Sequence, residues 1–180
     1  MLRRTLIILY FPLLLASCSA VPVEKYAHLN PKLDLMTFFS GKTKAWGQFQ
    51  NRNGDLIRRF EVEIHGTVTK TPNGKRLVLD EHFLYDDGEK QHRQWVITET
   101  APNQYEGKAG DVIGTAKGMS AGPVLNWRYT LDLPYKDDSL HVQFDDWMFL
   151  QTDTTLINRA EVTKWGFKVG EVTLFFRKDS

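Results

Sequence analysis

Charged side chains that could do chemistry occur at alternate positions of segments whose pattern is typical of β-strands. Glu81 shares one face of its segment with Leu79 and Phe83, and Arg93 shares one face of the next segment with Trp95. A carboxylate on an inward face costs free energy unless it is paired, and Arg93 is the partner that we expect. The pair would serve either as an internal ion pair or as the polar end of a ligand site.

Three more polar residues, Tyr129, Asp146 and Asn158, lie among apolar residues with the same period of two. They are either satisfied polar groups in a packed interior or the polar spot of a ligand cavity, and both interpretations stay open. The candidate ligand-binding residues are Glu81, Arg93, Trp95, Tyr129, Asp146 and Asn158. Glu81 and Asp146 could instead act as the acid and base of an enzyme with a lipid-like substrate.

One motif matches a nucleophile elbow letter for letter, namely Gly118-Met119-Ser120-Ala121-Gly122. That motif needs a strand-to-helix turn, which strains the serine outward and lets helix amides stabilise an oxyanion. Here the flanking segments read as strands and Pro123 follows the motif. We therefore predict a loop and no catalytic residue.

The histidines of the mature chain show no metal-ligand spacing such as His-x-x-x-His. Alternation turns His82 away from Glu81 and His92 away from Arg93, so we expect both on the surface. The pairs of aspartates lack a calcium-loop pattern, and no phosphate loop is present. Neither a metal nor a cofactor is predicted, which favours binding over catalysis.

Ten segments of alternating or apolar character are separated by turn residues: 43–50, 55–70, 75–85, 89–99, 104–110, 113–118, 123–133, 139–150, 154–164 and 168–177. No segment after residue 42 sustains a helical period. The pattern predicts an all-β antiparallel meander of about 8–10 strands that closes into an up-and-down barrel, because closure removes exposed edges. Residues 33–39 are expected to form one or two helical turns as a short lead-in.

The turn residues also predict register. A three-residue loop ending in a left-handed Gly88 pairs Glu81 with Arg93, Phe83 with Gln91 and Leu79 with Trp95.

A two-residue turn at Asn73-Gly74 would pair Gly66 with Glu81, Val68 with Leu79 and Ile64 with Phe83. Glycine in that position would leave open space beside the Glu81 carboxylate.

The N-terminus is typical of a secretory leader, with Arg3 and Arg4 before an apolar run that is too short to span a membrane. Leu15-Ala16-Ser17-Cys18 resembles the lipobox of bacterial lipoproteins, in which the cysteine is acylated. The expected organisation is a signal peptide at 1–17, a lipid anchor and tether at 18–42 and a barrel at 43–180. Ser19 in place of an aspartate favours the outer membrane.

Composition excludes several classes of protein. The 23 basic and 22 acidic residues give no concentrated positive charge, which argues against nucleic-acid binding. The single cysteine excludes disulfides and, once acylated, a catalytic thiol. A hydrophobic content of 42% predicts a folded domain.

The chain resembles an uncharacterised bacterial lipoprotein family, known only as a domain of unknown function. The resemblance rests on Phe38-Phe39-Ser40-Gly41, Ala45-Trp46-Gly47, Leu79-Asp80-Glu81, Tyr85-Asp86-Asp87-Gly88-Glu89, Arg93-Gln94-Trp95, Asp111-Val112-Ile113-Gly114, Trp127-Arg128-Tyr129, Asp145-Asp146-Trp147-Met148, Asn158-Arg159-Ala160 and Val169-Gly170-Glu171. It implies a lipocalin-like barrel and supplies no activity.

Together these observations predict an outer-membrane lipoprotein whose periplasm-facing barrel binds an amphipathic or lipid-like molecule, such as a fatty acid. The alternatives are an enzyme with inward carboxylates or a purely structural envelope protein. The membrane, reached through the N-terminal lipid, is the expected partner.

Overall fold

The computed structural model describes residues 21–72, 74–135 and 138–179. The predicted leader, the lipobox and Cys18 lie outside these residues. No helix within the described ranges is long and apolar enough to cross a membrane.

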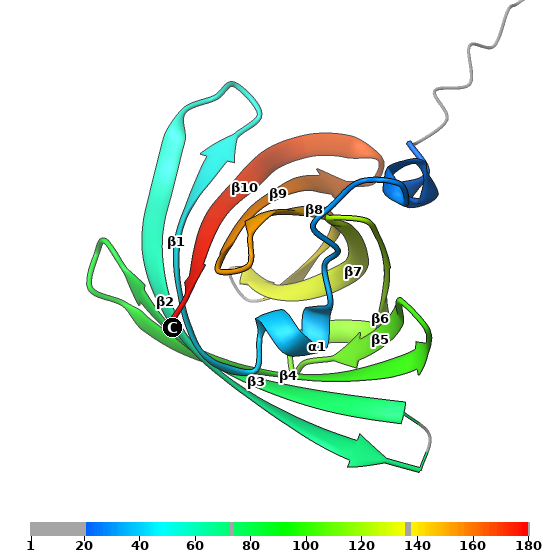
Figure 1. The fold of residues 1–180 in the computed structure, drawn as a ribbon. Coiled ribbons are helices and arrows are strands. Elements are labelled where there is room, and N and C mark those ends of the chain that lie inside the picture. The colour runs from blue at the N-terminus through cyan, green and yellow to red at the C-terminus, as the bar shows by residue number, and fades with distance from the viewer. Residues whose placement is uncertain (1–20, 73, 136–137, 180) are drawn as a thin grey trace, which may run out of the picture.

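Ten antiparallel strands form one closed barrel, viewed along its axis in Figure 1. Their bounds are β1 Gly41–Asn51, β2 Leu56–Thr71, β3 Gly74–Tyr85, β4 Lys90–Ala101, β5 Gln104–Lys108, β6 Val112–Ala121, β7 Val124–Tyr135, β8 Asp138–Thr152, β9 Thr155–Lys164 and β10 Phe167–Lys178. Each strand pairs with its neighbours in sequence, and β1 pairs with β10 to close the ring. The predicted all-β up-and-down barrel is confirmed, and closure pairs the first strand, β1, with the last, β10.

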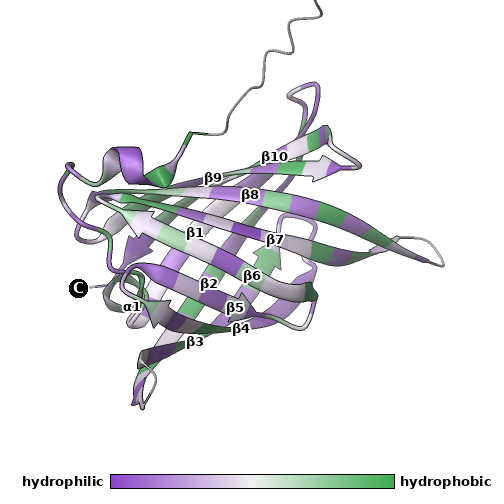
Figure 2. Cartoon of the chain, turned by 90° about the vertical axis from the view of Figure 1, so that its right-hand side faces the viewer, coloured by the Kyte–Doolittle hydropathy of each residue, from purple (hydrophilic) through white to green (hydrophobic). Residues whose placement is uncertain are grey.

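The inward face of each strand carries the apolar residues because successive side chains point to opposite sides of a strand. In β9, Leu156, Asn158, Ala160 and Val162 are buried, while Ile157 between them is exposed. Figure 2 shows this alternation as colour changes along the strands.

A short N-terminal lead-in closes one end of the barrel. After the 3-10 helix η1 (Val23–Tyr26) comes the helix α1 (Leu35–Phe38), as predicted for residues 33–39. The Asp34 carboxylate caps α1 by accepting hydrogen bonds from the amides of Met36 and Thr37. Residues 21–40 are therefore more than a tether, because Leu35 and its apolar neighbours pack into the core as a floor.

Lys178, at the end of β10, holds the floor in place. Its ammonium group donates to the carbonyl oxygens of Thr37 at 3.1 Å, Phe38 at 2.8 Å and Ser40. These carbonyls follow or end α1, where a cation also complements the helix dipole. Burial lowers the pKa of Lys178.

The opposite end of the barrel is open, and among the described residues it is bordered by the loops that join β1 to β2, β3 to β4, β5 to β6 and β9 to β10. In Figure 2 these loops lie at the far end from α1. At the β9–β10 turn, Trp165 and Phe167 are 83% and 75% exposed. We call this end the mouth.

Register matches the prediction on one side of β3. Glu81 pairs with Arg93, Phe83 with Gln91 and Leu79 with Trp95. Gly88 has a φ of 85°, which glycine adopts without a Cβ penalty.

On the other side of β3 the predicted partners are wrong by two residues. Glu81 pairs with Ile64, and Gly66 pairs with Leu79. Thr71 pairs with Gly74, so the strands turn one residue earlier than predicted. The predicted turn would have made Pro72 a paired strand residue, and proline has no N–H to donate to a strand partner.

Gly66 therefore leaves no space beside Glu81. A Cβ on Gly66 would lie 1.6 Å from the Phe39 carbonyl oxygen, so only glycine allows the backbone of the floor to pack this closely against β2.

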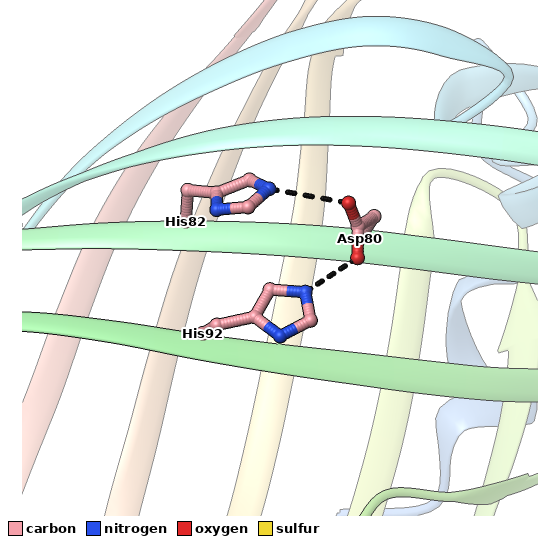
Figure 3. Close-up of side chains that lie close together, drawn as sticks. All are labelled: Asp80, His82 and His92. Atoms are coloured by element: carbon pink, nitrogen blue, oxygen red, sulfur yellow. Dashed lines mark hydrogen bonds and ion pairs between the residues drawn. The ribbon is translucent and has the colours of Figure 1, made fainter.

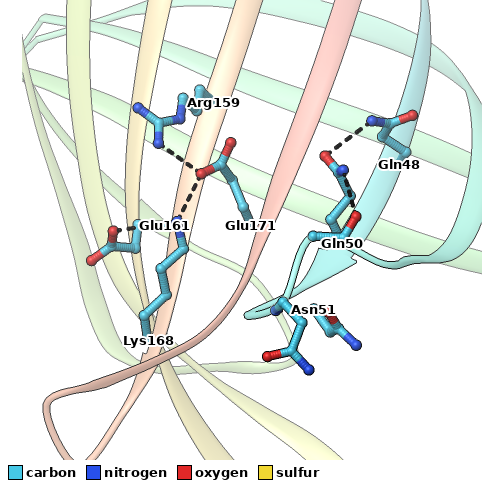
Figure 4. A network of polar contacts seen from close by, with 9 residues as sticks. Gln48, Gln50, Asn51, Arg159, Glu161, Lys168 and Glu171 are labelled. Carbon is cyan, nitrogen blue, oxygen red and sulfur yellow. Dashed lines mark hydrogen bonds and ion pairs between the residues drawn. The ribbon is translucent and has the colours of Figure 1, made fainter.

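Ion pairs on the outer face join the last two strands, as Figure 4 shows. Glu171 in β10 accepts from Arg159 in β9 at 2.7 Å and from Lys168 at 2.9 Å. The hydrogen bond from Arg159 is the largest influence on the pKa of Glu171 and helps to lower it to about 2.

Candidate functional site

The barrel encloses a cavity of about 590 Å³. Its floor includes Leu35 and Phe39, and its walls are inward residues of the strands. All six candidate ligand-binding residues line it: Glu81, Arg93, Trp95, Tyr129, Asp146 and Asn158. The interior is thus hollow rather than fully packed, and the residues that period-two alternation singled out lie around one space.

Arg93 bonds to a carboxylate other than the expected one. Although Glu81 is its partner in register, its Nε and Nη2 donate to Oδ2 of Asp111 at 3.0 and 2.5 Å. The pairing of β4 with β5 ends at Val96 and Lys108, so the chain that turns after β5 brings Asp111 alongside Arg93. The expected direct Glu81–Arg93 ion pair is absent from the described residues.

Asp111 is the site residue that sequence reasoning missed. It lies in a loop, outside any alternating pattern, and its only signal is membership of a motif in the family resemblance. Its Oδ1 is buried without a hydrogen-bond partner in the described structure.

Glu81 projects from β3 into the cavity and makes no ion pair within the described ranges. Burial raises the pKa of Glu81 from 4.5 to about 7; Arg93 opposes this shift, and Asp111 and Asp146 add to it. At neutral pH the carboxyl group is therefore divided between its neutral and charged forms.

Asp146, on β8, is the second inward carboxyl group and is 6% exposed. Burial raises its pKa from 3.8 to about 6, while hydrogen bonds with Tyr129 and Asn158 act in the opposite direction. The Asn158 amide also donates to the Trp147 carbonyl oxygen at 3.4 Å, which fixes its orientation. The same surroundings raise the pKa of Tyr129 well above 10, chiefly through burial.

An aromatic wall adjoins these polar groups. Trp95 packs edge-on against Trp127 and Tyr129, with ring centroids 5.8 and 5.4 Å away. Two glycines make room for the Trp127 indole, because a Cβ on Gly107 or Gly118 would lie within 2.6 Å of its ring atoms.

The nucleophile-elbow motif belongs to this wall and not to a catalytic loop. β6 continues through Ser120 to Ala121, so the predicted loop is wrong. Ser120 is buried, its Oγ lies 3.4 Å from Oδ1 of Asn103, and β7 rather than a helix follows. Gly118 has a packing role beneath Trp127.

The charges around the cavity do not balance. Arg93 pairs with Asp111, and Arg58 near the mouth pairs through Nη2 with Asp87 at 2.8 Å and Glu89 at 2.7 Å, while its Nε is buried without a hydrogen-bond partner in the described structure. In the described structure the Glu81 and Asp146 carboxyls have no cation of their own. The polar part of the cavity is therefore acidic, within a lining that is mostly apolar and aromatic.

Comparison with solved structures shows the fold. An S-type phycobiliprotein lyase from Guillardia theta is 9% identical, with 81% of this chain and 91% of that chain covered and a TM-score of 0.53. A de novo designed fluorescence-activating β-barrel is 12% identical, with 82% and 99% covered and a TM-score of 0.42. The likeness to the lyase concerns the fold alone and agrees with the closed lipocalin-like barrel seen here.

Sequence comparison gives a family but no activity. The family model described as "Protein of unknown function (DUF3833)" matches residues 12–178. No curated protein matches the chain significantly.

Proposed function

Because the chain belongs to DUF3833, a family of proteins of unknown function, we propose its role from its own cavity: the barrel binds one amphipathic small molecule. The apolar part of the ligand packs between the floor and the aromatic wall. Its head group meets Glu81 and Asp146. The observation that carries the proposal is a cavity inside the barrel, open at the mouth, with a few convergent polar groups in an apolar lining.

The size of the cavity supports a ligand with a medium-length chain. Binding sites for small molecules commonly measure about 300–1,000 Å³, and 590 Å³ lies within that range. The floor closes one end, so we infer that the ligand enters through the mouth, where Ile57 is both cavity-lining and 56% exposed.

The acidic character of the cavity supports a neutral or cationic head group. A fatty-acid carboxylate would bring a third negative charge beside Glu81 and Asp146. The nearby Arg93 is already paired with Asp111. A hydroxyl, amide or amine head group can donate hydrogen bonds to these carboxylates instead. We therefore infer an alcohol, amide or amine in place of the fatty acid that the sequence suggested.

The cellular setting is a further part of the proposal. The leader and lipobox pattern supports an outer-membrane lipoprotein held through acylated Cys18, with the barrel facing the periplasm. Several acyl chains on one cysteine would give stable anchoring, since a single chain binds only weakly. Mass spectrometry of the purified protein tests this step, because an unmodified Cys18 would contradict it.

Head-group preference can be measured with dodecanol, dodecylamine and dodecanoate, which share one chain length. Of the five tryptophans, Trp95 and Trp127 line the cavity, so their emission should report binding. At pH 8 we expect saturable one-to-one binding of the alcohol and the amine, and at least tenfold weaker binding of the carboxylate.

A variant with both Glu81→Gln and Asp146→Asn provides the control. It should bind dodecanol like the parent and lose the discrimination between amine and carboxylate. Tightest binding of dodecanoate by the parent would contradict the head-group proposal, and saturation by none of the three would contradict the binding function.

A further inference from the structure

We propose that the outer face of the β3–β4 hairpin binds a divalent transition-metal ion, with zinc as the reference ion, through Asp80, His82 and His92. These side chains lie outside the cavity and have no part in the ligand site described above. The three residues are called the outer cluster below.

Strand pairing brings the outer cluster together. His82 on β3 lies directly opposite His92 on β4, and Asp80 lies two residues before His82 on the same face. Linear spacing cannot reveal this arrangement, because the two histidines are ten positions apart in sequence and become neighbours only across the hairpin.

Both imidazoles turn toward the same carboxylate, as Figure 3 shows. Nε2 of His92 lies 2.6 Å from Oδ1 of Asp80, and Nε2 of His82 lies 3.2 Å from Oδ2. The two rings are 4.8 Å apart between centroids and inclined by 30°. Three potential ligand atoms therefore already converge, one from each side chain.

The distances suit a metal ion after a small adjustment. One potential ligand atom from each residue lies within 4.8 Å of the others. Zinc takes nitrogen and carboxylate ligands at about 2.0–2.2 Å, so two ligands of one ion lie at most about 4.4 Å apart. The His82 and His92 side chains are 62% and 54% exposed, which leaves their rotamers free to close this difference.

The donor set selects the class of ion. Two imidazoles and one carboxylate suit zinc and its neighbours among the transition metals, whereas calcium and magnesium prefer oxygen ligands alone. Three protein ligands would leave a fourth position of a tetrahedral ion for water, since the outer-cluster side chains are partly exposed.

The neighbouring outer residues on β2 favour a cation. Glu63 pairs with His82 and His65 pairs with Asp80, and both are exposed on the same face. The carboxylate of Glu63 adds negative charge next to the outer cluster, and His65 adds a further imidazole beside Asp80.

A bound ion would join β3 to β4 directly behind the candidate ligand site. Glu81 lies between Asp80 and His82 in sequence and pairs with Arg93, which follows His92. The metal would thus fix the backbone from which these two inward side chains project.

The test uses the full chain in a non-ionic detergent, stripped with EDTA and alkylated so that Cys18 offers no thiol. Competition with a chromophoric chelator measures zinc stoichiometry and affinity. We expect one zinc ion per chain, and at least tenfold weaker binding for His82→Ala and for His92→Ala.

His141→Ala is the matched control, because His141 is also an exposed strand histidine beside one aspartate, Asp132, at 3.4 Å. It should bind zinc like the parent. Saturating zinc should also raise the Tm of the parent by roughly 5 °C and leave that of the His82→Ala, His92→Ala double variant unchanged.

Melting without zinc checks that each variant folds. A parent without stoichiometric zinc, or folded His82→Ala and His92→Ala variants with the affinity of the parent, would overturn the proposal.

Discussion

Glu81 is a carboxyl group in the cavity whose charged form is costly. It faces a mostly apolar interior, and its neighbour Arg93 bonds to Asp111 instead. The position of Glu81 follows from simple alternation along β3, so sequence could predict it. The pairing of Arg93 with Asp111 could not be predicted, because it depends on where a loop between two strands turns in space.

We predict that Glu81→Gln stabilises the fold in a pH-dependent way. The pKa of Glu81 is raised from 4.5 to about 7, so its contribution to stability is fully present below pH 4.5 and is lost as pH rises through 7. Glutamine removes this loss. The gain in unfolding free energy should grow from about 0.5 kcal/mol at pH 5 to on the order of 2 kcal/mol at pH 8, less than the full shift implies because the cavity admits solvent.

Urea denaturation at pH 5, 6, 7 and 8 measures this effect. Glu106→Gln, at an exposed position of β5, is the control and should show no such trend. A gain for Glu81→Gln that stays constant with pH would show that the carboxyl group ionises as freely in the barrel as in water.

At the scale of elements, the barrel depends on a floor that is held from two sides. Lys178 binds the carbonyls at the end of α1, and Gly66 lets the Phe39 backbone approach β2. Sequence predicted the helical turns from their apolar spacing. It misplaced Gly66 because Asn73-Gly74 is a strong turn signal, whereas the backbone turns one residue earlier, at Pro72.

We predict that Gly66→Ala destabilises the protein by about 1–3 kcal/mol, the usual range for overpacking. The new Cβ would lie 1.6 Å from the Phe39 carbonyl oxygen, so the floor or β2 must shift. Gly110→Ala is the matched control, because a Cβ there meets open space, and its effect should stay within about 0.5 kcal/mol. Equal urea midpoints for the two variants would show that the close contact between Gly66 and the Phe39 backbone does not require glycine.

For the whole molecule, period-two alternation and explicit turns were enough to predict a closed barrel of about 8–10 strands, and the structure has ten. The same alternation predicted which side chains face inward, such as Asp146 and Asn158. It could not decide whether the interior is packed or hollow, because that depends on side-chain volumes summed around a closed ring. The confirmed β3–β4 register places His82 opposite His92, so the outer cluster follows from that register, although the spacing of histidines along the sequence gives no sign of it.

The central claim is that the cavity itself holds the ligand, and one comparison tests it most directly. Ala160 lines the cavity on β9, whereas Ile157 on the same strand points outward and is 38% exposed. Ala160→Phe fills the cavity, while Ile157→Phe adds an aromatic ring outside it. Calorimetric titration with dodecanol, whose neutral head group avoids the charge question, should give one-to-one binding for the parent and Ile157→Phe. Binding to a folded Ala160→Phe variant should be at least tenfold weaker, whereas undiminished binding to that variant, or none to the parent, would contradict the account.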